Sequence, residues 1–208
     1  MKVLVAIPCM DTLDTMFVNS LLGMKKQGLT QIQFQSSSLV YDSRNKLALD
    51  AVEGEFDYIL WLDSDMIFPE TLLIDLLKSI EGKDFVTALA FARRPPFSPC
   101  IYKKIRLGEE CETEQYLDYP KGIFEIDGCG FACCLMKTEM FKALEDIGDY
   151  RPFSPIVGFG EDLSACMKLK KLGYKLWCDS NIKVGHVART VVTEDSYQGF
   201  RAYTERNK

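Results

Sequence analysis

The sequence predicts an α/β fold in which a mostly parallel, doubly wound central sheet carries helices on both faces. Three observations support this prediction. Strand and helix patterns alternate from Lys2 to Ala92, and several of the strands are apolar on both faces, as in buried parallel sheets. In addition, the apolar run Tyr58 to Leu62 ends abruptly at Asp63-Ser64-Asp65. Ligands of open α/β sheets bind at the carboxyl ends of strands, so this acidic turn is a candidate site.

The first part of the chain has the pattern of three strand-helix units followed by a fourth strand. The expected strands are residues 2–7, 31–35, 58–62 and 84–91. The expected starts of the three helices are Asp11 or Thr12, Asp42 or Ser43, and Pro69. These residue types cap or open helices. The polar alternation of residues 31–35 indicates a strand nearer the edge of the sheet, and the order β-α-β-α-β-α-β favours parallel strands.

The second part of the chain is less regular. Residues 93–122 have the composition of surface loops, with a short hairpin from about 100 to 107, and residues 123–136 return to a strand interrupted by glycines. Thr138 is expected to cap a helix, and the aromatic, Gly- and Pro-containing loop 148–160 suits a cover over a site. The remaining expected elements are a helix beginning at Glu161, short strands at 175–178 and 182–187, and a polar tail at 188–208.

Length and composition are those of one globular domain. The chain has 208 residues, of which 47% are hydrophobic and 26% charged, which is enough apolar mass for a core. A balance of 25 Lys and Arg against 30 Asp and Glu gives a formal net charge of −5, which opposes binding to a nucleic-acid polymer. Since no apolar run approaches the roughly 20 residues of a membrane helix, we expect no membrane span and a cytoplasmic location.

Eight cysteines raise the question of disulfides or a zinc site. Cys9 and Cys178 stand inside apolar segments, as Cys166 does, which indicates reduced thiols in the core rather than a disulfide framework. Cys129, Cys133 and Cys134 form no CxxC pair, and the chain has a single histidine. A structural zinc site is therefore not favoured.

Asp63 and Asp65 form the first constellation with possible chemistry. They point to opposite sides of an extended backbone, so one can coordinate an ion while the other acts through water or on a sugar. Carboxylate oxygens favour Mg²⁺ or Mn²⁺, ions that keep positions open for phosphate oxygens. His186, the single histidine, is a candidate further ligand because imidazole binds Mn²⁺ well. Solvated loop aspartates and a structural histidine are the plain alternatives.

Glu161 and Asp162 stand at a helix start, where acidic residues stabilise the helix dipole or act as a general base at a pocket wall. Arg44 also lies near a helix start, where a guanidinium and free N–H groups bind anions. Arg93 and Arg94 follow a strand and are weaker candidates of the same kind. The chain has no GxxxxGK[ST] loop and no GxGxxG after the first strand, so any phosphates must be held by a metal and side chains.

Taken together, these motifs resemble the GT-A glycosyltransferases of family 2 type. The residues that carry the resemblance, in chain order, are Val5-Ala6-Ile7-Pro8, Ser43-Arg44-Asn45, Ile59 to Asp65 before Pro69, Gly160-Glu161-Asp162, Leu172-Gly173-Tyr174 and Gly185-His186. The match spans roughly residues 1–187. It implies one catalytic domain with a nucleotide-binding part at about 1–92 and an acceptor part at about 93–187, followed by the tail at 188–208.

The resemblance implies a metal-dependent hexosyltransferase that moves a sugar from a nucleotide-diphosphate sugar to an acceptor hydroxyl, on a saccharide or another molecule, with inversion. A UDP-sugar is the favoured donor on family frequency. The implied nucleotide-binding residues are Pro8, Ser43, Arg44, Asp63, Ser64 and Asp65. The implied ligands of Mn²⁺ or Mg²⁺ are Asp63, Asp65 and His186, with Asp65 in direct contact and Asp63 toward ribose or water. Asp162 is implied as the catalytic base and Glu161 as an acceptor contact.

Two other functions compete with this hypothesis. A nucleotide-sugar binding module would keep the fold and the donor site without turnover. A haloacid-dehalogenase-like phosphatase also places DxD after an apolar strand, with the first aspartate as nucleophile. That family has Thr or Val where this chain has Ile67, and its DxD usually follows the first strand, so it is the less favoured alternative.

Overall fold

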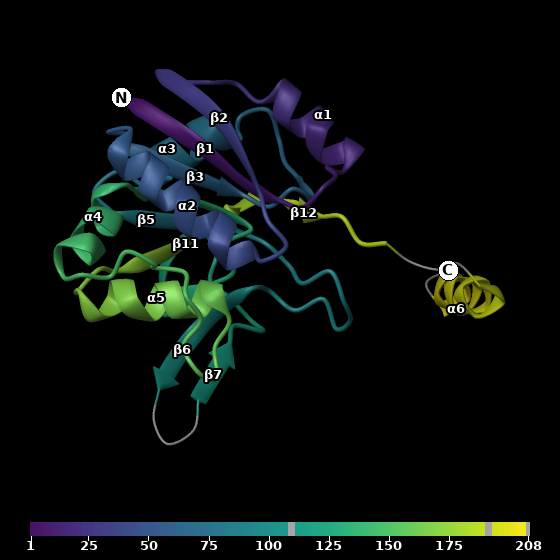
Figure 1. Cartoon of the computed structure of the whole chain (residues 1–208). Helices are drawn as coiled ribbons and strands as arrows, with labels where there is room; N and C mark the ends of the chain where they lie inside the picture. Colours follow the sequence, from purple (N-terminus) through teal and green to yellow (C-terminus); the bar gives the residue numbers. More distant parts are fainter. Residues whose placement is uncertain (108–110, 190–192, 207–208) are drawn as a thin grey trace.

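A seven-stranded sheet forms the centre of the protein (Figure 1), with the strand order β2-β1-β3-β10-β5-β11-β8. The computed structural model describes residues 1–107, 111–189 and 193–206. The strands are β1 (Lys2–Cys9), β2 (Leu29–Ser36), β3 (Tyr58–Leu62), β4 (Met66–Ile67), β5 (Phe85–Leu89), β6 (Ile101–Leu107), β7 (Cys111–Gln115), β8 (Ile123–Ile126), β9 (Gly128–Cys129), β10 (Cys133–Lys137), β11 (Leu176–Lys183) and β12 (Gly185–His186). The helices are α1 (Thr15–Gly23), α2 (Val40–Glu53), α3 (Leu72–Ser79), α4 (Glu139–Asp146), α5 (Glu161–Lys171) and α6 (Glu194–Arg206).

The central sheet is mixed, so the expectation of a mostly parallel sheet is wrong. β1 pairs in parallel with β2 and β3, and β5 with β11. β10 lies antiparallel between β3 and β5, and β8 is antiparallel to β11. The chain thus returns after β5 to insert β10 where a doubly wound sheet would place β5 beside β3. A buried strand is apolar on both faces in either direction, so its residues do not reveal which way it runs.

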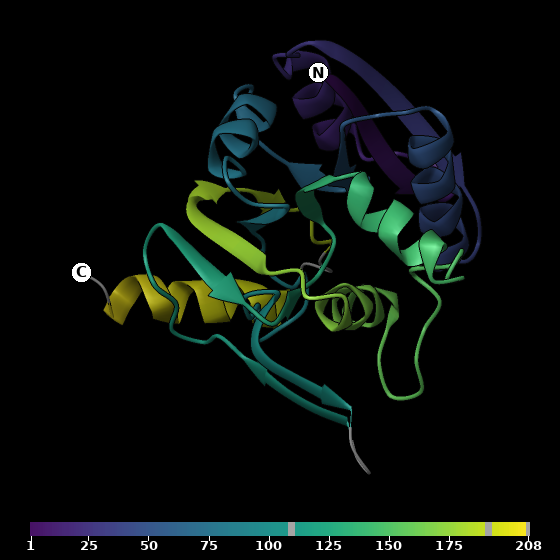
Figure 2. The same cartoon turned by 90° about the vertical axis from the view of Figure 1, so that its left-hand side faces the viewer.

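Helices cover both faces of the sheet, as expected (Figures 1 and 2). Alternate side chains of each strand enter two cores. Val5 of β1 joins the core under α1 and α3 with Phe17 and Leu73, whereas Ala6 joins the core under α2, α4 and α5 with Trp61. The interior residues of β1 are buried on both sides, which explains why its sequence is continuously apolar rather than alternating.

The predicted starts of the first three helices are wrong. α1 begins at Thr15 and is capped by Asp14, whose Oδ1 accepts the Met16 N–H at 2.8 Å, not by Asp11 or Thr12. α2 begins at Val40 after Leu39, which makes no side-chain cap bond, so Asp42 and Ser43 lie inside the helix. α3 begins at Leu72, after Pro69. Without a polar residue at the cap of α2, its start leaves no sequence signal.

The second half of the chain matches the prediction in part. The short hairpin expected within residues 100–107 is wrong: residues 101–107 form the single strand β6, which pairs with β7 and β9. β7 lies in the stretch that was expected to be a surface loop. Strands were expected at 175–178 and 182–187, and two are present with other bounds: β11, which extends to Lys183 with a register irregularity between Asp179 and Lys183, and the short β12. α6 replaces part of the predicted tail and lies apart from the sheet in Figure 1. None of the described helices has both the length and the apolar character needed to cross a lipid bilayer.

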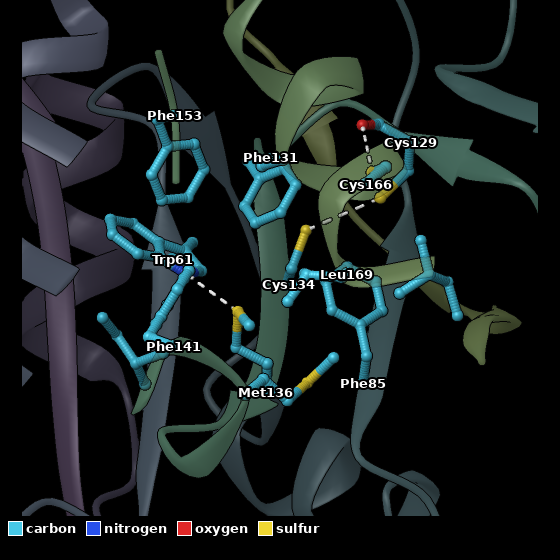
Figure 3. Close-up of a cluster of buried hydrophobic side chains, with 14 of the residues drawn as sticks. Trp61, Phe85, Cys129, Phe131, Cys134, Met136, Phe141, Phe153, Cys166 and Leu169 are labelled. Atoms are coloured by element: carbon cyan, nitrogen blue, oxygen red, sulfur yellow. Dashed lines mark hydrogen bonds between the residues drawn. The ribbon is translucent and has the colours of Figure 1, made fainter. Parts of the chain in front are cut away.

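An aromatic cluster fills the core on the α2 side (Figure 3). Trp61 meets Phe131, Phe141 and Phe153 edge to face, with ring centroids 6.2, 6.0 and 5.0 Å apart, a geometry that aromatic pairs prefer. The Trp61 Nε1–H points at the sulfur of Met136 at 3.3 Å. Free thiols such as Cys129, Cys134 and Cys166 pack beside the rings. Trp61, at the centre of this cluster, belongs to the end of β3, and the acidic turn Asp63-Ser64-Asp65 follows directly.

Replacing Phe153 with alanine should lower the free energy of unfolding by about 3–5 kcal/mol, the usual cost of emptying a buried aromatic position. Phe153 is fully buried and touches three other rings, so the cavity cannot close without moving the cluster. Urea denaturation measures the effect. Tyr150→Ala, at a position 66% exposed, is the control and should change stability by less than about 0.5 kcal/mol. A loss below about 1 kcal/mol for Phe153→Ala would contradict the packing described.

Candidate active site

A two-stranded sheet joins the acidic turn after β3 to the end of β12. In this sheet β4 pairs antiparallel with β12, so Met66 stands opposite His186. The Val187 N–H donates to the Asp65 carbonyl at 2.9 Å, and the Asp63 N–H donates to the carbonyl of Ala132 at 3.0 Å. Residues far apart in the sequence thereby become neighbours at the carboxyl end of β3, where ligands of α/β proteins bind.

Asp65 and His186 are in direct contact. Nε2 of His186 lies 3.2 Å from Oδ1 of Asp65, and Nδ1 lies 3.0 Å from the carbonyl oxygen of Phe91. Burial raises the pKa of Asp65, but the hydrogen bond and charge of His186, with the charge of Arg93, outweigh it and hold the pKa below its ordinary value. The hydrogen bond to Asp65 raises the pKa of His186 above its ordinary value. Arg93 forms an ion pair with Oδ2 of the same carboxylate.

Arg44 is a buried cation at the centre of the site. Its side chain comes from α2, is 1% exposed, and lies 5.7 Å from the ring centroids of Trp61, Phe131 and Phe153. Nη2 donates to Oδ1 of Asp63 at 2.9 Å, and Nη1 donates to the Phe131 carbonyl at 3.3 Å. Since an unpaired buried charge is strongly unfavourable, the ion pair with Asp63 is essential to placing this arginine in the core.

Two further carboxylates face Arg44 from the start of α5. Oδ1 of Asp162 lies 3.6 Å from Nη2, and Oε1 of Glu161 lies 3.9 Å from Nε. Burial raises the pKa of Asp162 to about 7; Arg44 opposes this, while the negative charges of Glu161 and Asp63 add to it. Burial likewise raises the pKa of Asp63 against the pull of Arg44. Carboxylates outnumber the arginine, so one of them is readily protonated near neutral pH.

The segment Ser43-Arg44-Asn45 is buried within α2 and not exposed at the helix start. Arg44 is therefore bound to protein groups and is not presented as the free anion contact that the sequence suggested. Asn45 accepts the Phe153 N–H through Oδ1 at 2.9 Å and so ties the loop before α5 to α2. The Ser43 hydroxyl has no hydrogen-bond partner among the residues that the structure describes.

A cavity of about 380 Å³ opens over these side chains. Its wall includes the predicted site residues Pro8, Arg44, Asp63, Ser64, Asp65, Glu161 and Asp162. Ser43 is buried in α2 and is not part of the wall, and His186 adjoins the cavity through Asp65. The structure thus brings together the predicted base and the DxD motif from segments that lie far apart in the sequence.

The metal ligands predicted from the sequence are brought together only in part. Asp65 and His186 face each other, but Asp63 turns to Arg44. In the described part of the chain, no three His, Cys, Asp or Glu side chains are placed to hold a metal ion. The Asp65–His186 pair nevertheless fits a cation. When Nδ1–H of His186 donates to the Phe91 carbonyl, the lone pair of Nε2 points at the Asp65 carboxylate. Nε2 and the carboxylate oxygen are then both acceptors, so a proton or a metal ion must lie between them.

Comparison with known proteins places the fold. Neither protein-family models nor curated proteins yield a match to this chain. Among solved structures, A197 from STIV matches with a TM-score of 0.64 and 21% sequence identity, over 91% of this chain and 87% of that one. GalNAc-T7, in a crystal structure with UDP, GalNAc and Mn²⁺, matches with a TM-score of 0.60 and 12% identity. The fold is similar to that of GT-A glycosyltransferases.

The match to GalNAc-T7 covers 98% of this chain but 48% of that protein, so the chain spans about half the length of this relative. At these identities the likeness concerns the fold. The GT-A-like fold implied by the sequence motifs is thereby confirmed, with a mixed sheet in place of a mostly parallel one.

Sequence reasoning missed three contacts of the site. The carbonyls of Phe91 and Phe131, which receive His186 and Arg44, are backbone groups and carry no signal in the residue type. The ion pair of Arg93 with Asp65 was also unforeseen, because Arg93 stands in a stretch without periodicity. Because Arg93 follows a strand, the sequence suggested that it binds an anionic ligand. It did not suggest the ion pair with Asp65.

In metal-free protein, Asp162→Asn should raise the free energy of unfolding more at pH 8 than at pH 4.5. The folded pKa of about 7 exceeds the roughly 4 of an unfolded aspartate. The folded state therefore binds the extra proton between these values, and the stability due to this group falls as pH rises through the interval. Asparagine removes this dependence, so the gain at pH 8 should exceed that at pH 4.5 by about 1–3 kcal/mol.

Urea denaturation in the presence of EDTA at both pH values measures this difference. Asp118→Asn is the control, since Asp118 is exposed, and it should show no such pH dependence. An Asp162→Asn effect of the same size at both pH values would show that Asp162 has an ordinary pKa.

Proposed function

We propose that the protein is a metal-dependent glycosyltransferase that moves a sugar from a UDP-sugar to an acceptor hydroxyl with inversion. The observation that supports this most directly is the single cavity lined by Asp63, Asp65 and Asp162 in a fold similar to GT-A glycosyltransferases. The cavity combines a carboxylate that stays ionised with one whose pKa is about 7. Two carboxylates whose environments separate their pKa values suit different roles in one reaction.

The donor nucleotide is assigned to the part of the cavity between the end of β1 and the start of α2. Pro8 and Cys9 line it on one side, and the hydroxyl-bearing Ser37 and Ser38 on the other. This placement agrees with the rule that ligands of α/β proteins lie beyond the carboxyl ends of the strands. It also brings the diphosphate of the donor to Ser64 and the neighbouring carboxylates.

Asp65 and His186 are the residues that would hold Mn²⁺ or Mg²⁺. When bound, such an ion neutralises the charge that develops on the diphosphate as its bond to the sugar breaks. Ions of this type are commonly held by one or two protein ligands together with substrate phosphates. Two protein ligands, Asp65 and His186, agree with this pattern. Asp63, whose Oδ1 is bonded to Arg44, is assigned to the ribose or to a contact through water.

Asp162 is the proposed general base. Its raised pKa of about 7 is close to the working range in which a carboxylate both accepts a proton and is available in its ionised form. The Arg44 guanidinium lies 3.6 Å from Oδ1, and Asp162 lines the cavity. Glu161, which also lines the cavity, is assigned to acceptor contacts. The base removes the proton of the acceptor hydroxyl as that oxygen attacks the anomeric carbon, and a single displacement of this kind inverts the configuration.

UDP together with Mn²⁺ should raise the melting temperature of the protein, whereas either alone should raise it much less. Ligand at 100 times its Kd adds about 2.7 kcal/mol of stability, which corresponds to about 5–10 °C for a chain of this size. Asp65→Asn and His186→Ala should remove the Mn²⁺-dependent part of the shift, and Asp118→Asn should retain it. If no nucleoside diphosphate gives a metal-dependent shift, the transferase proposal is wrong at its first step.

Asp162→Asn should strongly reduce turnover while leaving donor binding intact. Loss of a general base lowers rates by about 10²–10⁴-fold, measured here as release of UDP from UDP-sugars in Mn²⁺ with and without acceptors. The same protein should keep the thermal shift with UDP and Mn²⁺. Binding without turnover in wild type and variant alike would favour the nucleotide-sugar binding module, and equal turnover in both would remove Asp162 from the mechanism.

A further inference from the structure

A second cavity lies on the other side of the acidic turn. It has a volume of about 480 Å³, and its wall includes three arginines, Arg93, Arg94 and Arg189, next to Ser64 and Asp65. The chain as a whole has a formal net charge of −5, so this concentration of guanidinium groups departs from its overall balance. Guanidinium groups carry a permanent charge and a planar set of donors that match phosphate oxygens.

The positive charges on the wall of this cavity are only partly neutralised by carboxylates of the protein. Its acidic wall residues are Asp14 and Asp65. Asp14 accepts the N–H of Met16 as the cap of α1, and Asp65 is engaged by His186 and Arg93. Arg94 and Arg189 are exposed and form no ion pair with any residue in the described ranges. Two guanidinium groups therefore remain available to an anion in the cavity.

The loop that carries Arg93 and Arg94 is held at its base. Phe91 and Pro99 form a β-bridge, and the Ala92 N–H donates to the Ser98 carbonyl at 2.9 Å. Across the turn, the N–H of Phe97 donates to the Arg94 carbonyl at 2.9 Å. The Phe91 carbonyl also accepts His186, so this loop and the Asp65–His186 pair share one framework. The two arginines are thus presented by a restrained turn beside the proposed metal ligands.

We propose that Arg93, Arg94 and Arg189 form a binding site for a diphosphate group, and that Arg93 exchanges its ion pair with Asp65 for a phosphate oxygen when a divalent cation occupies Asp65. This inference rests on the proposed function for the identity of the ligand, the diphosphate of the donor. The two cavities share Ser64, Asp65 and Arg93, so a donor with its nucleoside in the first cavity reaches the arginines with its phosphates.

The exchange at Asp65 follows from the geometry of its two oxygens. Oδ1 faces His186, and Oδ2 is occupied by Arg93, whose side chain is 57% exposed. The Asp65 side chain is 21% exposed, so the exposed partner of this pair is Arg93 alone. A solvated guanidinium contributes little to holding such a pair, and a divalent cation at Asp65 displaces it. The guanidinium of Arg93, once released, then lies next to the diphosphate that the divalent cation at Asp65 binds. The departing nucleoside diphosphate gains negative charge as its bond to the sugar breaks, so these arginines stabilise the transition state more than the intact donor.

Titration calorimetry with inorganic pyrophosphate in EDTA tests the anion site without any turnover. Wild type should bind pyrophosphate, Arg94→Ala and Arg189→Ala should each bind it about tenfold more weakly, and the double variant more weakly still. Arg106→Ala, which removes an exposed arginine of β6 outside the cavity, should bind as wild type does. Equal affinity of the double variant and wild type overturns the site, and equal affinity of wild type for phosphate and pyrophosphate overturns its assignment to a diphosphate.

Binding of Mn²⁺ alone, followed by the electron paramagnetic resonance signal of the free ion, tests the exchange. Arg93→Ala should bind Mn²⁺ about two- to fivefold more tightly than wild type, because the competing guanidinium is gone. Unchanged or weaker Mn²⁺ binding in Arg93→Ala overturns the exchange.

The two proposals fail in different ways. Suppose that UDP raises the melting temperature in a metal-dependent way, but the Arg94→Ala, Arg189→Ala double variant binds pyrophosphate as tightly as wild type. This result overturns the arginine site and supports the transferase. Suppose instead that pyrophosphate binding depends on the arginines, but UDP with Mn²⁺ does not raise the melting temperature. This result supports the anion site and overturns the transferase.

Discussion

The geometry of the site depends on one buried guanidinium. Arg44 lies among three aromatic rings with 1% of its surface exposed, and a cation in such surroundings persists only when it is paired. Asp63 pairs with it from the end of β3, and Asp162 approaches it from the start of α5. The energetic need to neutralise one charge therefore fixes two distant segments relative to each other before any ligand is present.

The same arrangement separates the carboxylates into two kinds. Asp65 stands between His186 and Arg93, which hold its pKa below the ordinary value, whereas Asp162 shares Arg44 with Asp63 and Glu161 and has a pKa raised to about 7. Neighbouring acidic groups cannot all be stabilised by a single cation. The wall of one cavity thus holds two aspartates whose pKa values are shifted in opposite directions, with no difference in residue type between them.

The sequence allowed the main strands of the central sheet, the helical layers and part of the cavity wall to be predicted, because apolar runs and their polar ends are local signals. Ser37, Ser38 and Val40 of that wall were not singled out as site residues. The antiparallel direction of β10 was not predictable, since residues 133–136 are apolar and buried on both faces, whichever way the strand runs. The burial of Arg44 was hidden too, because an arginine between a serine and an asparagine has the composition of an exposed helix start. Its partners come from three separated segments, and only the folded chain brings them together.

The insertion of β10 also bears on how the two halves of the domain relate. β3 and β5 lie within residues 1–92, yet both form strand hydrogen bonds with β10, which comes from residues 133–137. A fragment that ended near residue 92 would lack β10 and β11, the two neighbours of β5, and would leave one edge of β3 unpaired. Hydrophobic strands with unpaired edges readily pair with other chains. The strands of the first 92 residues therefore depend on the later part of the chain to complete the central sheet.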